Sequence, residues 1–477
     1  MRVLFASVEM SPLAKVGGLA DVTGSLPKAL VRAGHDVRVI MPLHAGIDTA
    51  AHGFRRVLAE VPVQTPRGAE RTSLWQGTVG GVTTYLIEAM DLFERPAIYG
   101  EPDDAQRFLF FSDAVLATVP DLEWQPEVLH LQDWHTAFVA ARLRAEPSHP
   151  LARAALVYTI HNLALRGDFD AVFARANGLV IPRVAGVAAA DRRNGMALGI
   201  LSADVISTVS ESYAREILTP EFGAGLDPLL RRRREDLFGI VNGIDLEAYD
   251  PALDPDIPAY FSAADPAPKR EDKAALQREC GLPVDEEIPL VGVVNRLFWQ
   301  KGMDIAAEGV GKALKDTSLQ FVALGTGDTL YERQLKELER RHPASVRVVL
   351  GFEPALGQRI YAGADMFLMP SRYEPCGLGQ MIAMRYGAVP VVRRTGGLAD
   401  TVPDDDEHPG AGAGFQFEAA DGDALAEALR RAIRAYREPA RWRQIMQRGM
   451  TRDFSWEEAA AKYVALYERA RERARMR

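Results

Sequence analysis

Short apolar segments alternate with amphipathic segments along most of the chain. The first of them, residues 3–8, is largely apolar at both alternating sets of positions, as expected of a strand covered on both faces of a parallel sheet. After a Gly-containing loop, apolar residues recur at helical spacing from Leu19 to Ala33, and Gly34 ends the predicted helix. Further strands are predicted at 37–41, 128–131, 155–160 and 205–209. This alternation indicates a doubly wound α/β fold.

The pattern changes between about 250 and 288 and then starts again. The stretch 254–268 is rich in Asp and Pro and resembles a linker or a surface excursion. Beyond it, buried strands are predicted at 289–294, 319–324, 346–350, 366–369 and 389–392. A second polar patch, 404–410, also resembles a linker. The sequence therefore predicts two Rossmann-like, doubly wound parallel-sheet domains that face a deep cleft between them.

We place an N-terminal domain at 1–242, a C-terminal domain at 243–455 and a C-terminal helix at 456–477. The apolar stripe of this helix consists of Trp456, Ala460, Tyr463 and Tyr467. We expect the helix to pack back on the N-terminal domain, because such a stripe needs a surface to cover it.

Composition and charge exclude several classes of protein. The 477 residues carry a net charge of −9, which argues against sequence-independent nucleic-acid binding, since that depends on cations that neutralise phosphates. The two cysteines, Cys280 and Cys376, do not make a disulfide framework. Glu9 ends the first apolar run, which resembles a strand and not a signal peptide, and we find no apolar stretch of membrane-helix length. We therefore expect a cytoplasmic protein that binds no membrane.

Each half opens with a strand and a loop that places a Lys close to Gly. In the first half the loop contains Lys15, Gly17 and Gly18, and in the second it contains Lys301 and Gly302. Such loops bring cations and backbone N–H groups to the carboxyl ends of strands, where open α/β sheets bind ligands. Neither loop matches the dinucleotide or triphosphatase fingerprints, and the Gly17–Gly18 pair alone could equally be a tight turn.

The second half contains further candidates for binding a phosphorylated sugar. Arg296 and Lys301 are close enough in sequence to act on one phosphate, although alone they would resemble solvated surface cations. Glu374 follows the 366–369 strand and could hold sugar or ribose hydroxyls, while Gly377 allows a helix N-terminus to approach a diphosphate. For Cys376 we favour a buried filler over a site contact.

Two polar clusters follow neighbouring strands of the first half. His161 and Asn162 end the 155–160 strand, and Asp133 follows the 128–131 strand. Both clusters lie at the same edge of the predicted sheet, and this shared position favours function over a structural role. We assign no metal site, because the short Asp-x-Asp match at Asp168 and Asp170 is common by chance.

Several longer motifs, in the same order, resemble those of bacterial glycogen synthases and plant starch synthases, which are retaining glycosyltransferases of the two-domain GT-B type. The resemblance covers nearly the whole chain and rests on segments 15–22, 132–135, 159–163, 209–217, 241–245, Arg296 with 300–302, 374–378 and 394–402. It implies that glucose is transferred, with retention, from a nucleotide sugar, usually ADP-glucose, to the non-reducing end of an α-1,4-glucan such as glycogen. No cofactor or metal is implied.

The resemblance also implies roles for particular residues. The donor-binding residues would be Lys15, Gly17, Gly18, Asn242, Arg296, Lys301, Phe352, Glu374, Cys376, Gly377, Leu378 and Thr395. The glucose and acceptor side would be lined by Asp21, Tyr99, Asp133, His161 and Asn162. Those implied in catalysis are His161, Glu374, Arg296, Lys301, Lys15 and Asp133. Phe352 would stack on the adenine ring.

Two features of the sequence distinguish between possible activities within this resemblance. The stretch 166–195 is short and diverges from the pattern of the family, and the property that this affects most is acceptor binding. Related broad-substrate transferases carry a second Glu eight positions after the Glu that corresponds to Glu374. This chain has Ile382 at that position, which favours the synthase branch. The alternatives are a GT-B transferase with another donor or a short acceptor, and a glucan-binding protein without turnover. The sequence leaves the oligomeric state open.

Overall fold

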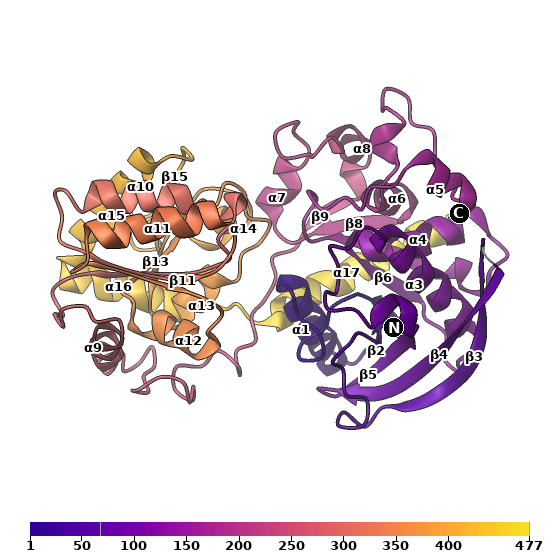
Figure 1. The fold of residues 1–477 in the computed structure, drawn as a ribbon, viewed down its shortest axis with the longest axis horizontal. Coiled ribbons are helices and arrows are strands. Elements are labelled where there is room, and N and C mark those ends of the chain that lie inside the picture. The colour runs from indigo at the N-terminus through magenta and orange to yellow at the C-terminus, as the bar shows by residue number, and fades with distance from the viewer. Residues whose placement is uncertain (67, 477) are drawn as a thin grey trace. The chain divides into compact units, whose positions relative to one another are not determined.

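A computed structural model of the protein describes residues 1–66 and 68–476, which divide into two compact units (Figure 1). Unit 1 consists of Met1–Gly243 together with the segment from Trp456 onward, and unit 2 of Ile244–Ser455. Each unit contains one β-sheet with helices on both faces, the arrangement expected of a doubly wound α/β fold.

The sheet of unit 1 has nine strands, in the order β3-β4-β5-β2-β1-β6-β7-β8-β9. All neighbouring strands are parallel except the β3–β4 and β4–β5 pairs. The strands are β1 (Arg2–Ala6), β2 (Asp36–Pro42), β3 (Arg55–Thr65), β4 (Gly68–Val79), β5 (Val82–Glu88), β6 (Val128–Gln132), β7 (Ala155–Ile160), β8 (Val205–Thr208) and β9 (Leu237–Gly239). The antiparallel β3–β4 hairpin is an addition that the apolar pattern did not predict, because many of its residues are polar and exposed.

The two faces of β1 belong to different hydrophobic clusters. Leu4 and Ala6 pack in the cluster that includes α3 (Asp104–Thr118), α4 (Asp133–Ala145) and α6 (Gly195–Ser202). Val3 and Phe5 pack in the cluster with α1 (Gly18–Arg32) and α17 (Trp456–Arg475). This division explains why the strand is apolar at successive positions. Shorter helices complete the unit, namely α2 (Met90–Phe93), α5 (Ala171–Ala176), α7 (Glu211–Glu216) and α8 (Asp227–Arg232).

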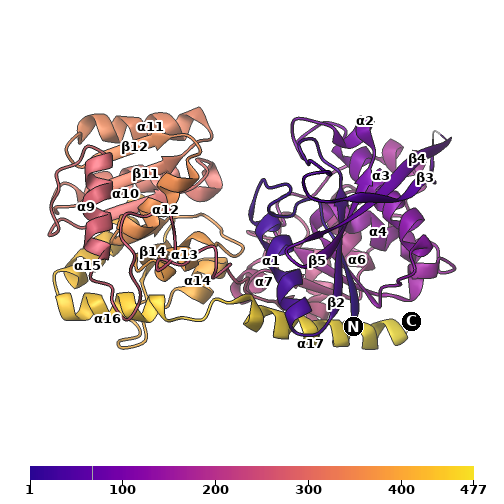
Figure 2. The same ribbon diagram turned by 90° about the horizontal axis from the view of Figure 1, so that it is seen from below.

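Helix α17 returns to unit 1 after the chain has passed through unit 2. It lies beside α1, as Figure 2 shows, and also contacts β7. Its residues Trp456, Tyr463 and Tyr467 are buried. The hydroxyl of Tyr467 lies 2.9 Å from Nδ1 of His130 on β6, although 337 positions separate the two residues. The aromatic stripe of the terminal helix is therefore part of the core of unit 1.

The sheet of unit 2 has six parallel strands, in the order β12-β11-β10-β13-β14-β15. They are β10 (Leu290–Val294), β11 (Gln320–Gly325), β12 (Val346–Leu350), β13 (Met366–Met369), β14 (Val389–Arg393) and β15 (Phe415–Phe417). The helices are α9 (Lys269–Glu279), α10 (Met303–Ala313), α11 (Thr329–Arg341), α12 (Pro354–Gly363), α13 (Gly379–Arg385), α14 (Gly396–Thr401), α15 (Gly422–Tyr436) and α16 (Pro439–Met450). Val291 and Val293 pack with α10 and α15, whereas Leu290 packs with α9 and α12.

The stretch 254–268, interpreted above as a linker or surface excursion, is part of unit 2. Asp254 is buried, and its Oδ2 accepts hydrogen bonds from the hydroxyl of Tyr386 (2.5 Å) and from Nε2 of Gln358 (2.9 Å). The next helix is fixed by an ion pair between Lys273 and Asp365 (2.8 Å). The Pro and Asp content therefore reflects an irregular segment that is bound to the core by specific polar contacts.

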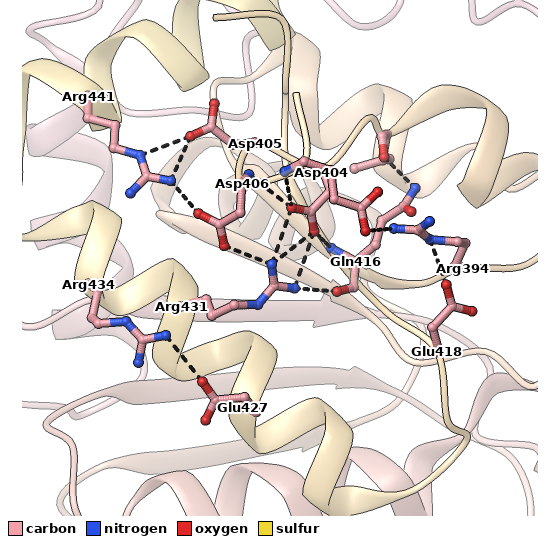
Figure 3. Close-up of polar contacts among 12 residues, drawn as sticks. Arg394, Asp404, Asp405, Asp406, Gln416, Glu418, Glu427, Arg431, Arg434 and Arg441 are labelled. Carbon is pink, nitrogen blue, oxygen red and sulfur yellow. Dashed lines mark hydrogen bonds and ion pairs between the residues drawn. The ribbon is translucent and has the colours of Figure 1, made fainter. Parts of the chain in front are cut away.

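The interpretation of 404–410 as a linker is wrong for its three aspartates, which form an ion-pair network with the last helices (Figure 3). Arg431 of α15 contacts Asp404 (3.2 Å) and Asp406 (2.8 Å). Arg441 of α16 contacts Asp405 (2.9 Å) and Asp406 (2.6 Å). Asp404 and Asp405 are buried, so this loop is held firmly against α15 and α16.

Among the helices of residues 1–66 and 68–476, none combines the length and the apolar composition that a membrane crossing requires.

Candidate functional site

The strand order of each sheet identifies where a ligand crevice is expected. In unit 1 the chain passes from β1 outward to β2 and later returns to β6 on the other side of β1. The loops that leave β1 and β6 therefore diverge at their carboxyl ends, and open α/β sheets bind ligands at such a switch point. The predicted residue Lys15 belongs to the loop after β1, and Asp133 is the first residue of α4, directly after β6.

Buried Glu9 holds the loop that follows β1. Its Oε2 accepts hydrogen bonds from the backbone N–H groups of Val16 (2.6 Å) and Gly17 (2.9 Å), and its Oε1 accepts one from the hydroxyl of Tyr99 (2.9 Å). Burial raises the pKa of Glu9, and the three hydrogen bonds oppose that rise. The carboxyl group therefore fixes both the loop and the predicted acceptor-side residue Tyr99.

The loop ends at the start of α1, where the predicted phosphate contacts lie. Lys15 is exposed, and its Nζ is 2.6 Å from Oδ1 of Asp21. Gly17 is the N-cap of the helix and provides no side chain to cap it, and nothing lies within 4 Å of the Cβ position that another residue would occupy there. Gly18 is exposed at the first helical position. The N-terminus of this helix thus offers backbone N–H groups and a partial positive charge to an anion.

Asp133 and His161 are brought together as their strand positions suggested. Asp133 has a φ of +54°, an uncommon conformation for a residue with a side chain, and it begins α4 directly after β6. Its Oδ1 accepts hydrogen bonds from the backbone N–H groups of His161 (2.8 Å) and Asn162 (3.5 Å). Asp133 therefore fixes the backbone at the end of β7, which positions the His161 ring.

Burial controls the charge of this cluster. Desolvation raises the pKa of Asp133 to about 7, and it lowers the pKa of His161 to about 3. The imidazole of His161 is therefore neutral near neutral pH, and its Nε2 lies 2.8 Å from Oε1 of Gln132. A neutral imidazole can donate or accept a hydrogen bond but cannot act as a resident cation.

Sequence reasoning did not assign roles to Glu9, Gln132 or His135. His135 is buried beside Tyr99, with ring centroids 5.2 Å apart, and desolvation lowers its pKa to about 3. For Glu9 a signal was present, because a carboxylate that follows the predicted 3–8 strand occupies the same edge as the predicted site. Its hydrogen bonds to a loop seven positions away could not be inferred from that placement.

In unit 2 the switch point lies between β10 and β13, and the two groups with the strongest sequence signal meet there. Lys301 follows β10 and Glu374 follows β13. The Nζ of Lys301 is 2.9 Å from Oε1 and 2.8 Å from Oε2 of Glu374, and the hydroxyl of Ser371 donates to Oε2 (2.8 Å). Both charged side chains are largely buried. The pair places a cation and a carboxylate at the position where this sheet type binds ligands.

The loop after Glu374 packs directly on the start of α14. The backbone N–H of Gly397 donates to the carbonyl of Glu374 (3.0 Å), and a Cβ at Gly397 would lie 2.1 Å from the carbonyl oxygen of Cys376. Gly377 has a φ of +76°, which other residues rarely adopt. Cys376 and Thr395 are buried, whereas Gly377 and Leu378 are partly exposed. The structure thus joins two of the predicted donor-binding segments.

Other predicted donor residues are exposed or lie apart from this pair. Arg296 is exposed, with its guanidinium 5.4 Å from the ring centroid of Phe298. The side chain of Phe352 is 87% exposed, after β12. Asn242 is buried in unit 1, and its Oδ1 accepts no hydrogen bond from the described residues.

Taken within each unit, the arrangement offers cations, uncapped backbone N–H groups and fixed carboxylates. These are the groups that bind and stabilise negative charge on phosphate oxygens and that hold sugar hydroxyls. Across residues 1–66 and 68–476, no three His, Cys, Asp or Glu side chains are grouped so that they could hold a metal ion.

Comparison with known proteins gives matches over the whole chain. The family described as starch synthase catalytic domain matches residues 2–232, and the family described as glycosyl transferases group 1 matches residues 288–435. A glycogen synthase 2 from Geobacter sulfurreducens is 45% identical, with 98% of this chain and 99% of the relative covered. A glycogen synthase from Geotalea daltonii is 44% identical, with 98% of each covered.

Among solved structures, the catalytic domain of starch synthase IV from Arabidopsis thaliana, bound to ADP and acarbose, superimposes with a TM-score of 0.90. It is 36% identical to this chain, and the match covers 99% of both.

Proposed function

The chain belongs to the family of bacterial glycogen synthases and plant starch synthases, and we propose that it transfers glucose, with retention, from ADP-glucose to the non-reducing end of an α-1,4-glucan. It has the GT-B fold of that family. The relatives named above support the reaction, and the ADP and acarbose bound by the starch synthase IV domain support a nucleotide-sugar donor and a glucan acceptor for this chain.

In this proposal unit 2 binds the donor. Arg296 and Lys301 neutralise the diphosphate as it departs, and the backbone at Gly377 and Leu378 donates to phosphate oxygens. Glu374 holds donor-sugar hydroxyls, and its position is set by Lys301 and Ser371. The exposed ring of Phe352 stacks on the adenine. Cys376 is buried and packs as a small apolar residue under the loop that contains Glu374 and Gly377.

Unit 1 provides the glucose and acceptor side. Lys15 and the backbone at Gly17 and Gly18 approach the donor phosphates and glucose. The N–H group of Gly18 is offered to the ligand, whereas that of Gly17 is bound by Glu9, which holds this loop in place. The remaining residues that we assign to this side are Asp21, Tyr99, Asp133, His161, Asn162 and, for the donor, Asn242. Because His161 is neutral, it acts through hydrogen bonding at the reacting face of the sugar.

The chemistry that these groups support is departure of the nucleoside diphosphate with negative charge developing on its oxygens. Fixed cations and helix N–H groups stabilise that charge, and the acceptor hydroxyl attacks from the same face of the sugar. We do not assign a carboxylate nucleophile. The binding of donor and acceptor together supplies orientation. We expect the reaction to need no added metal or cofactor.

The observation on which the proposal depends is the Lys301–Glu374 pair at the switch point of unit 2. The test is transfer of labelled glucose to glycogen, with ADP-glucose and UDP-glucose compared and with chelator in a parallel reaction. We expect elongation with ADP-glucose that chelator does not reduce. Elongation only with another nucleotide sugar would correct the donor, and no elongation by the folded protein would contradict the proposed reaction.

A further inference from the structure

Exposed aromatic side chains gather at the carboxyl edge of the sheet in unit 2. Phe298 is 37% exposed, Trp299 56% and Phe352 87%, and all three follow strands of this sheet. Of the six tryptophans of the chain, Trp299 alone is exposed. An exposed indole is costly to leave in water, and an exposed aromatic beside a binding site is a common ligand contact.

Trp299 is held in place although its ring is exposed. The guanidinium carbon of Arg372 lies 4.9 Å from the ring centroid, and Nη1 of Arg372 donates to the carbonyl of Trp299 (2.9 Å). Arg372 is fixed in turn by two hydrogen bonds to Asp304, of 2.8 and 2.7 Å. The ring is therefore arranged before any ligand binds, and little side-chain freedom remains to be lost on binding.

The strand order places Trp299 and Phe352 on opposite sides of β10. Phe352 follows β12, which lies two strands away from β10 in one direction. Trp299 packs on Arg372, which follows β13, the neighbour of β10 in the other direction. If the diphosphate contacts Arg296 and Lys301 after β10, an adenine on Phe352 extends to one side and the sugar to the other.

We propose that Trp299 stacks against a glucose unit of the α-glucan acceptor, a contact that rests on the proposed function. The C–H bonds of a glucose ring form an apolar face that matches the face of an indole, and an α-glucan presents such a face on each of its glucose units. The contact would add a residue of unit 2 to the acceptor-side residues assigned above to unit 1. The guanidinium of Arg372 lies over one face of the ring, and Trp299 remains 56% exposed, which leaves room for a sugar on the other face. Trp299 is thus a substrate-binding residue and takes no part in the departure of the diphosphate.

Steady-state kinetics with maltohexaose as acceptor test this contact. We expect Trp299→Ala to raise the KM for maltohexaose by about tenfold and to change the KM for ADP-glucose by less than about twofold. Trp299→Phe, which keeps an aromatic face, should recover most of the loss. Tyr260→Ala is the matched control, because Tyr260 is a similarly exposed aromatic (58%) in the irregular segment 254–268 and should leave both values unchanged.

Tryptophan fluorescence gives a second readout that does not depend on turnover. Titration with maltohexaose should change the emission of the wild-type protein, and the change should be lost in Trp299→Phe. An unchanged maltohexaose KM in Trp299→Ala, or a rise confined to ADP-glucose, would overturn the inference. If the wild-type protein still transferred glucose, the proposed function would stand. Absence of transfer by the wild-type protein would instead contradict that function.

Discussion

The two units hold the buried polar groups at their sheet edges in different ways. In unit 1, Glu9, Asp133 and His161 are bound by backbone N–H groups or neutral side chains, and burial moves their pKa values away from their usual ranges. In unit 2, Lys301 pairs with Glu374, and Arg372 pairs with Asp304, whose pKa the Arg372 hydrogen bonds lower. An ion pair favours the charged forms, whereas burial without a counter-ion disfavours them.

This difference teaches that burial in unit 1 ties the charge of the Asp133 carboxyl group to pH near neutrality, whereas Lys301 and Arg372 of unit 2 are paired with counter-ions. A departing diphosphate needs cations to stabilise it, and unit 2 supplies Lys301 for this role. A surface that contacts neutral sugar hydroxyls can contain neutral imidazole and a carboxyl group that is readily protonated. The following predictions test this contrast, starting with the largest effect.

Removal of either partner of the Lys301–Glu374 pair should have the largest effect on transfer. We expect Lys301→Ala and Glu374→Ala to lower kcat by about a thousandfold, because each removes a group that contacts charge or hydroxyls in the transition state. The measurement is glucose transfer from ADP-glucose to glycogen, with circular dichroism as a check of folding. A folded variant with a near-normal rate would show that the pair has a structural role only.

The carboxyl group of Glu9 should matter next, through the position of its loop. We expect Glu9→Gln to lower kcat/KM for ADP-glucose by about tenfold, because an amide retains only one of the two acceptor oxygens that bind Val16, Gly17 and Tyr99. Tyr99→Phe is the companion variant that removes the hydroxyl alone. An effect of Glu9→Gln no larger than that of Tyr99→Phe would contradict the loop-holding role.

Asp133 should make the stability of the protein depend on pH. Burial raises the pKa of Asp133 from the ordinary 3.8 of an aspartic acid to about 7 in the folded protein. Between these values the folded state holds more protons than the unfolded chain, so this contribution is complete at low pH and is lost as the pH rises through about 7. We expect Asp133→Asn, which keeps the acceptor oxygen, to flatten the fall in the free energy of unfolding by up to about 1 kcal/mol per pH unit.

Urea unfolding of both proteins at several values between about pH 5 and pH 7 measures this slope. Parallel curves for the wild-type protein and Asp133→Asn would show that Asp133 does not titrate in this window. The contrast with unit 2 would then rest on His161 and Glu9 alone.

The smallest effect is expected at Phe352. Phe352→Ala should raise the KM for ADP-glucose by about fivefold through loss of stacking on the adenine. The free energy of unfolding should not change, because the side chain is 87% exposed and contributes little to the core. Phe352→Tyr should restore the KM. A large loss of stability in Phe352→Ala would mean that the ring packs against the protein in solution.

Much of this architecture follows from local pattern. The segments 3–8, 128–131 and 155–160 are mostly apolar at both alternating sets of positions because helices cover both faces of the sheet, and this property is visible in the sequence. The same strand ends indicated that Asp133 and His161 share an edge, and the structure places a hydrogen bond between them. Their roles in catalysis stay predictions.

What pattern could not supply is the identity of distant partners. Asp404 and Asp405 were interpreted as part of a linker-like polar patch, but Arg431 and Arg441 form ion pairs with them. The β3–β4 hairpin was missed because its residues lack a continuous apolar face. The role of Glu9 in holding the loop after β1 was missed for the same reason, because it depends on three hydrogen-bond donors that only the folded chain brings to the carboxyl group.

The return of α17 to unit 1 has a consequence for biosynthesis. Val3 and Phe5 leave the ribosome long before α17, which covers their face of the sheet and is translated only after all of unit 2. The segment Met1–Gly243 therefore waits with part of its apolar surface open while the 212 residues of unit 2 are made. Completion of the first unit is thus tied to synthesis of the second.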